Sequence, residues 1–93
     1  MNNYEAMVII RPDLNENTRT EVFQQIEEQI TKNQGEIQSS KVWAEKHRMT
    51  FKIRKFDEGL YYVINFLLAP AAVIKIKQAW KLNDNILRVL ILR

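Results

Sequence analysis

The sequence contains no cysteine, and its 93 residues include only two glycines and one histidine. The absence of cysteine excludes disulfides, thiolate nucleophiles, zinc–thiolate sites and iron–sulfur clusters. Two glycines, Gly35 and Gly59, cannot form a glycine-rich phosphate loop. A metal site at His47 would need carboxylates as its other ligands, and no serine lies in a nucleophile-elbow motif. We therefore expect neither an enzyme nor a metal or cofactor site.

Long apolar runs are also missing. No stretch reaches the roughly 18 residues that a membrane span requires, and residues 1–5 do not resemble the start of a secretory signal. We therefore expect a cytoplasmic protein with no membrane partner. A chain of this length supports one small hydrophobic core, so we expect a single domain over residues 1–93.

Charge is distributed unevenly behind the net charge of +3. Residues 1–40 carry three basic and seven acidic side chains, whereas residues 41–93 carry eleven basic and four acidic ones. Such asymmetry suggests a polyanionic partner for the basic half of the chain. A solvated surface of mixed charge explains it equally well, so charge alone decides nothing.

Hydrophobic periodicity predicts six elements in the order strand, helix, strand, strand, helix, strand. The predicted strands cover residues 4–10, 36 to about 53, 60–68 and 86–92, and the second helix begins at Pro70. Right-handed crossovers favour an α+β fold of ferredoxin-like βαββαβ order, with two helices on one face of a four-stranded antiparallel sheet. The first and third strands are then central and the second lies at an edge.

Several boundaries follow from local signals. Thr18 and Glu21 have capping-box spacing at the first helix, although Asn15 or Asn17 could cap it instead. Gly35 suits a left-handed position after that helix. Ala44 and Glu45 mark a bulge, because the alternation on either side of them does not share one phase. Residues 56–59 are expected to form the turn before the third strand.

Cations and apolar residues alternate along residues 46–55. The cations are Lys46, Arg48, Lys52 and Arg54, and the apolar residues are Met49, Phe51 and Ile53. A strand here would present one apolar and one cationic face, the latter without acidic neighbours on its own strand. Such a face could neutralise nucleic-acid phosphates. It could equally protect an edge strand from aggregation.

The tryptophans and the aromatic residues of the third strand give weaker evidence about function than the cations do. Trp80 lies on the apolar face of the second helix and is expected in the core, whereas Trp43 could pack or contact a partner. Aromatic residues on the third strand could stack RNA bases, but the sequence signature of an RNA-recognition module is absent.

The chain as a whole resembles the bacterial-type ribosomal protein six family of the small ribosomal subunit. The resemblance rests on the order and spacing of short motifs over the whole chain. They are Tyr4-Glu5, Pro12–Leu14, Gly35, Trp43, Ile53–Lys55, Glu58-Gly59, Tyr61, Asn65-Phe66, Ala69-Pro70, Asn83-Asp84, Ile86, Arg88 and Leu90–Arg93. Two departures are Ala44, where the family has glycine, and Met49–Ile53, which lacks the family's proline.

The resemblance implies the same ferredoxin-like fold and a non-catalytic protein. It further implies binding to the central domain of small-subunit ribosomal RNA together with small-subunit protein eighteen. The abundance of isoleucine and asparagine suggests an AT-rich genome, which fits a cytoplasmic ribosome of a reduced bacterium or a plastid ribosome. Lys46, His47 and Arg48 match the family's basic run, and Arg88 matches its last-strand arginine. The residues expected to bind ribosomal RNA are Lys46, His47, Arg48, Lys52, Arg54, Lys55 and Arg88. Those expected to contact the partner protein are Trp43 and Tyr61.

Two other functions are open to the same topology, because one fold hosts many functions. The first alternative is a regulatory domain that binds a small molecule and acts as a homo-oligomer through its sheet. The second is a small phosphoryl-group hydrolase, which would need a glycine-rich loop after the first strand. Residues 11–14 are not such a loop.

Overall fold

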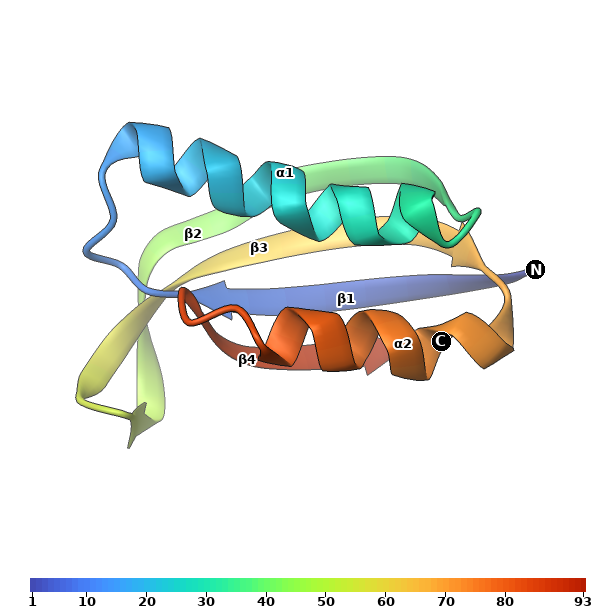
Figure 1. The fold of residues 1–93 in the computed structure, drawn as a ribbon. Coiled ribbons are helices and arrows are strands. Elements are labelled where there is room, and N and C mark those ends of the chain that lie inside the picture. Colours follow the sequence, from blue (N-terminus) through green and yellow to red (C-terminus); the bar gives the residue numbers. More distant parts are fainter.

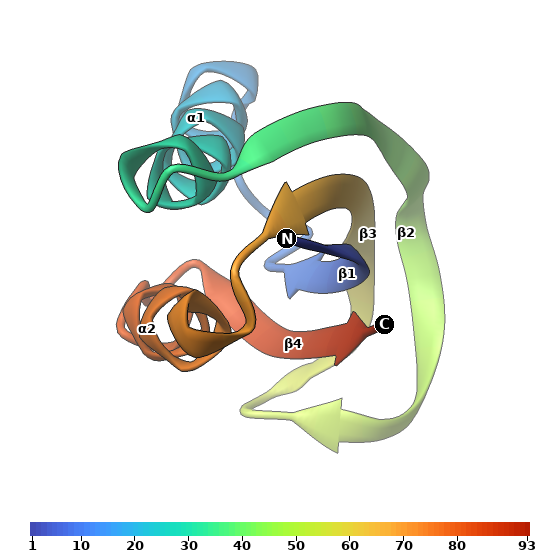
Figure 2. The same ribbon diagram turned by 90° about the vertical axis from the view of Figure 1, so that its right-hand side faces the viewer.

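Four antiparallel strands form one sheet, and both helices cover the same face of it (Figures 1 and 2). The computed structural model describes every residue from Met1 to Arg93. The elements are β1 (Asn2–Ile10), α1 (Glu16–Lys32), β2 (Glu36–Ile53), β3 (Phe56–Leu68), α2 (Pro70–Lys81) and β4 (Ile86–Leu92). The strand order is β2-β3-β1-β4. The predicted topology is confirmed, with β1 and β3 central and β2 at an edge.

The core lies between the sheet and the two helices. In β1, Ala6, Val8 and Ile10 are fully buried, which is the period-two pattern of a strand with one face on a core. Trp80 of α2 is only 2% exposed, and its indole Nε1 donates a hydrogen bond to the backbone oxygen of Ile26 at 3.2 Å. The prediction that Trp80 belongs to the core is therefore confirmed.

The two ends of α1 show which of the predicted capping residues are used. Of the candidate caps, Asn15 is the one used, since its side-chain oxygen accepts a hydrogen bond from the Thr18 amide at 2.8 Å. The expected left-handed conformation at Gly35 is wrong, because Gln34 adopts it with φ of 61°. Gly35 is needed for space instead: a Cβ there would lie 2.7 Å from Ile30 Cγ2 and 2.8 Å from Leu68 Cδ1.

The expected turn over residues 56–59 is also wrong. Ile53 pairs with Phe56, so the turn consists of Arg54 and Lys55, and β3 begins four residues earlier than predicted. Arg54 has φ of 59°, a left-handed conformation that is uncommon for residues other than glycine. Gly59 lies inside β3, where a Cβ would come within 2.5 Å of Ile9 Cγ2. That glycine permits close packing and does not mark a turn.

The edge strand β2 is long and irregular. The predicted bulge is confirmed by register shifts on both sides of Ala44, and a further shift lies between Arg48 and Ile53. The β2–β3 hairpin consequently curves around the face of the sheet that the helices leave uncovered (Figure 2). Met49 is only 9% exposed as a result, and it lines a small cavity together with Ile9. Neither helix is long and apolar enough to cross a membrane.

Candidate nucleic-acid interface

The curved hairpin carries most of the exposed cations that the sequence singled out. Lys46, Arg48, Lys52 and Lys55 are all exposed to solvent. The fold contains only two ion pairs, Arg11 with Asp13 at 3.0 Å and Arg19 with Glu45 at 2.7 Å. None of the cations proposed from the sequence forms an ion pair with a carboxylate of its own chain. Their charge is available to an external anion.

These cations do not form one alternating row, so that part of the prediction is wrong. The register shift between Arg48 and Ile53 breaks the phase of the strand, and Arg54 lies in the turn beyond its end. Arg48 also pairs across the ladder with Glu58, although the two side chains make no ion pair. The cations instead follow the curve of the hairpin from its bulge to its tip.

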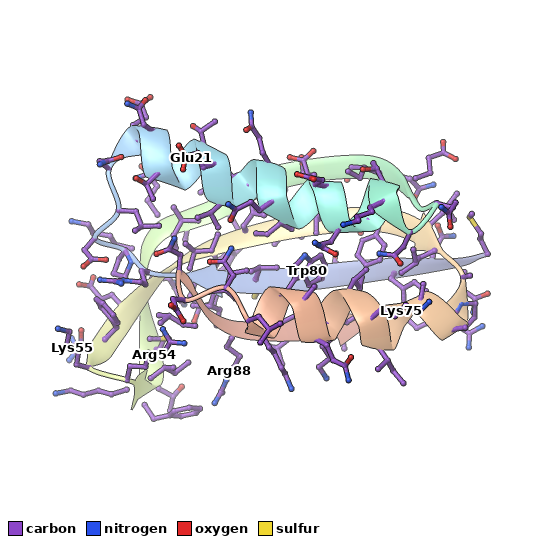
Figure 3. All side chains as sticks on the ribbon, in the orientation of Figure 1. Glu21, Arg54, Lys55, Lys75, Trp80 and Arg88 are labelled. Carbon is purple, nitrogen blue, oxygen red and sulfur yellow. The ribbon has the colours of Figure 1, made fainter.

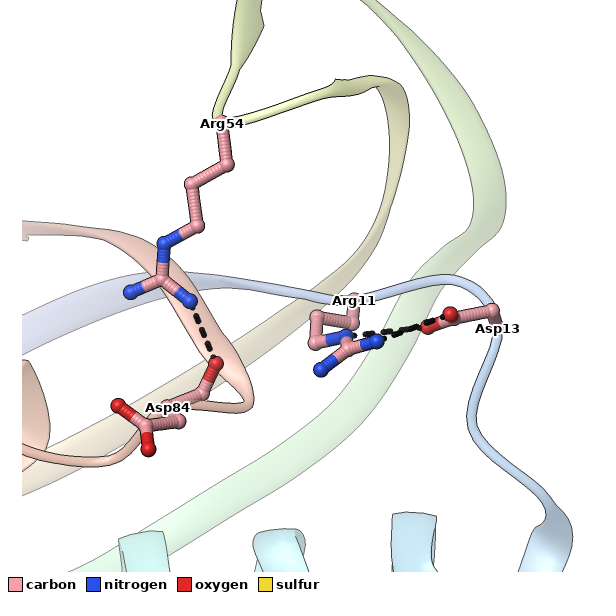
Figure 4. Close-up of polar contacts among 4 residues, drawn as sticks. All are labelled: Arg11, Asp13, Arg54 and Asp84. Carbon is pink, nitrogen blue, oxygen red and sulfur yellow. Dashed lines mark hydrogen bonds and ion pairs between the residues drawn. The ribbon is translucent and has the colours of Figure 1, made fainter.

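Two of the arginines are held in place by other elements. Arg54 Nη1 donates a hydrogen bond to the backbone oxygen of Asp84 at 2.7 Å, which ties the hairpin tip to the turn before β4 (Figure 4). The Arg88 guanidinium lies over the Phe51 ring, 4.7 Å from its centroid. Both arginines lie at the same end of the molecule as Lys55 (Figure 3).

A third arginine, Arg11, lies near the hairpin tip and contacts its own chain. Arg11 donates two hydrogen bonds to Asp13, from Nε at 3.2 Å and from Nη2 at 3.0 Å (Figure 4). This pairing lowers the pKa of Asp13 and raises the pKa of Arg11. The Arg11 guanidinium also lies 5.3 Å from the centroid of the Phe56 ring. Arg11 is therefore already engaged, unlike the hairpin lysines.

Three rings gather beside the bulge of β2. The His47 ring is 4.9 Å from that of Trp43 and 5.0 Å from that of Tyr61, in edge-on arrangements, and Trp43 and Tyr61 are 5.6 Å apart. Trp43 remains 51% exposed. The sequence assigned His47 to RNA and the other two residues to a partner protein, but the structure joins all three in one cluster.

Sequence reasoning missed an exposed apolar strip on β4. Leu90 is 51% exposed and Leu92 is 64% exposed, and both lie on an edge strand. The signal was present in the sequence, because a nearly continuous apolar strand in a two-layer fold has one face without a helix to cover it. Phe51 of the hairpin, 55% exposed, adds to the apolar surface on the same side.

Comparison with solved structures defines the class of the fold. The 30S ribosomal protein S6 of Thermotoga maritima superposes with a TM-score of 0.89 at 25% identity, over 98% of this chain and 85% of that one. The C-terminal domain of the MgtC protein of Mycobacterium tuberculosis gives a TM-score of 0.66 at 15% identity, over 97% and 84%. The second likeness shows the fold alone. The class is thus a ferredoxin-like α+β domain.

Comparison of sequences identifies the family within that class. The model of the family "Ribosomal protein S6" matches residues 3–93. Small ribosomal subunit protein bS6 of Synechocystis is 40% identical over 97% of this chain and 79% of its own length, and that of Symbiobacterium thermophilum is 38% identical over 100% and 97%. The chain belongs to the ribosomal protein S6 family. It is a structural component of the small ribosomal subunit and not an enzyme.

Proposed function

We propose that this chain binds the central domain of small-subunit ribosomal RNA together with small-subunit ribosomal protein eighteen, on a cytoplasmic or plastid ribosome. One observation carries the proposal: the candidate residues make no ion pair within the chain, although two ion pairs form elsewhere. Those residues are Lys46, His47, Arg48, Lys52, Arg54, Lys55 and Arg88. Basic side chains near a nucleic-acid backbone release counterions, which favours binding at low salt.

Edge protection accounts for only part of this pattern. Lysine on an edge strand discourages pairing with another sheet, and β2 is an edge strand. Lys55, however, lies in the turn, and Arg88 lies on β4 at the opposite edge. The cations continue past the hairpin tip and reach β4. This distribution is better explained by a partner with repeated negative charges than by protection of a single edge.

Exposed apolar surface beside the cations supports the proposal that a partner protein binds there. Trp43 is half exposed and packs against Tyr61, so the ring pair offers a rigid apolar contact beside the basic residues. Aromatic anchors of this kind are enriched in protein interfaces. Leu90 and Leu92 extend the apolar surface across the uncovered face of the sheet. We assign Trp43 and Tyr61 to the protein contact on this basis.

Neutralising two hairpin lysines tests the RNA contact. We expect Lys46→Gln/Lys52→Gln to weaken binding to a central-domain RNA fragment in the presence of protein eighteen. Filter binding over a range of KCl concentrations should show a log–log salt slope smaller by about one to two, since each phosphate contact contributes about 0.7 to 0.9.

The matched control is Lys32→Gln/Lys75→Gln, which removes the same charge from exposed positions on the two helices. We expect the control to bind nearly as the unchanged chain does. Equal behaviour of the two variants would contradict the hairpin as the binding surface. A chain that forms a salt-independent homodimer and binds no RNA would instead favour the regulatory-domain alternative.

A further inference from the structure

A basic cleft lies between the hairpin tip, α2 and β4, away from the β2 bulge. Its volume is about 350 Å³. The residues that line it are Arg54, Lys77, Lys81, Ile86, Leu87, Arg88, Val89 and Leu90. Its four charged side chains are all cations contributed by three different elements, and no carboxylate is among the lining residues.

The two arginines of the cleft are positioned before any ligand binds. Arg54 uses one guanidinium donor on the backbone oxygen of Asp84, which leaves its other N–H donors for an anion. Arg88 is stacked on Phe51, a contact that leaves the in-plane donors of its guanidinium open. A guanidinium held in this way can bind a phosphate through two parallel hydrogen bonds with less loss of side-chain freedom.

The two lysines bring further positive charge to the same place. Lys77 and Lys81 are four residues apart on α2, so they are neighbours on one helix face, and their like charges disfavour the isolated helix. The position of Lys81 in the last turn suits the helix dipole, but that explanation does not extend to Lys77, which lies a turn earlier. No acidic residue occurs anywhere in α2, and neither lysine forms an ion pair.

We infer that this cleft binds a backbone phosphate of the ribosomal RNA, at a contact separate from the one made by Lys46 and Lys52. The inference rests on the proposed function and adds Lys77 and Lys81 to the RNA contact. The four cations of the lining favour an anionic phosphate. Arg54 of the hairpin turn lines the cleft, so an RNA that reaches both contacts would pass the hairpin tip.

The first test compares Lys77→Gln/Lys81→Gln with Lys32→Gln/Lys75→Gln in the same binding assay. Lys75 lies on α2 outside the cleft, nearer the start of the helix (Figure 3). We expect the cleft variant alone to lose affinity and to reduce the salt slope by about one to two. Equal slopes for the two variants, with Lys46→Gln/Lys52→Gln still impaired, would overturn the cleft and leave the proposed function standing. Absence of salt-dependent binding by the unchanged chain would overturn the proposed function itself.

The second test does not depend on the lysine variants. Because the chain has no cysteine, Leu82→Cys provides a unique attachment point for an iron–EDTA cleavage reagent beside the cleft. Leu82, the residue that follows α2, is 84% exposed, and Ile74 of α2, the position of the control Ile74→Cys, is 66% exposed. We expect RNA cleavage from position 82 and much weaker cleavage from position 74. No cleavage from position 82, with cleavage from a reagent at Lys55→Cys, would overturn the inference.

Discussion

Gly35 shows that a single residue can be required for space and not for backbone conformation. Its missing side chain lets the end of α1 approach β3, since a Cβ would lie within 3 Å of both Ile30 and Leu68. We expect Gly35→Ala to lower the free energy of unfolding by about 1 to 3 kcal/mol through overpacking. Urea denaturation followed by circular dichroism measures the change.

The neighbouring Gln34 is the natural comparison. It occupies the left-handed conformation, so Gln34→Gly relieves a steric cost while it increases the entropy of the unfolded chain. We expect the two effects nearly to cancel. A Gly35→Ala variant as stable as Gln34→Gly would show that the contacts of position 35 with Ile30 and Leu68 impose no packing limit.

The buried side chain of Tyr62 makes the free energy of unfolding depend on pH in alkaline solution. Burial raises its pKa to about 12 from the ordinary 10.0, and its hydroxyl donates a hydrogen bond to a Glu27 carboxylate oxygen at 3.0 Å. The folded state therefore holds the proton more tightly than the unfolded state does. Its contribution to stability is fully present below pH 10 and is lost as the pH rises toward 12.

We expect urea midpoints measured between pH 9 and pH 12 to fall more steeply for the unchanged chain than for Tyr62→Phe. The phenylalanine keeps the stacking with Phe23, whose ring is 4.3 Å from that of Tyr62, but has no proton to lose. All other side chains are the same in both proteins, so the difference between the two curves isolates Tyr62. Parallel curves would contradict the raised pKa.

At the scale of elements, the β2–β3 hairpin has the most irregular strand pairing in the sheet. Its bulge and its second register shift interrupt the ladder, and its tip is tied to the turn before β4 through Arg54. Segments with few buried contacts open locally at a small cost in free energy. The hydrogen bond from Arg54 to Asp84 therefore helps to hold the tip of the hairpin that presents the proposed RNA-binding residues.

We expect Arg54→Ala to raise amide hydrogen exchange in residues 46–58 by about fivefold, the effect of losing a hydrogen bond of roughly 1 kcal/mol. The change keeps a Cβ, so the strain of the left-handed backbone is unaltered. Lys55→Ala is the matched control, because Lys55 is the other turn residue and its side chain makes no hydrogen bond. Similar exchange in both variants would mean that the Asp84 contact does not hold the tip.

At the scale of the whole molecule, folding concentrates a charge imbalance that is spread along the sequence. The acidic helix α1 and the purely basic helix α2 lie side by side on one face of the sheet (Figure 1). The hairpin brings further cations to the end of α2, so that positive charge collects from the bulge of β2 to the last turn of α2. An excess of positive charge over a surface raises the rate at which an anionic partner associates with it.

The sequence by itself determined the order of elements, the sheet topology and the core on the helix side. Periodicity reports these directly, since alternate residues of β1 and the stripe of Val22, Ile26 and Ile30 must face a common interior. It also identified the family and most of the exposed cations, because charge on the hairpin is a local property of the chain.

Only the tertiary structure decided which residues stand together. The path of β2 depends on register against β3, so the phase of its cations could not be obtained from alternation alone. The roles of Gly35 and Gly59 depend on side chains distant in sequence, which no local pattern reports. The basic cleft forms because the curved hairpin brings Arg54 near Lys77, Lys81 and Arg88, and that curvature depends on the register shifts between β2 and β3.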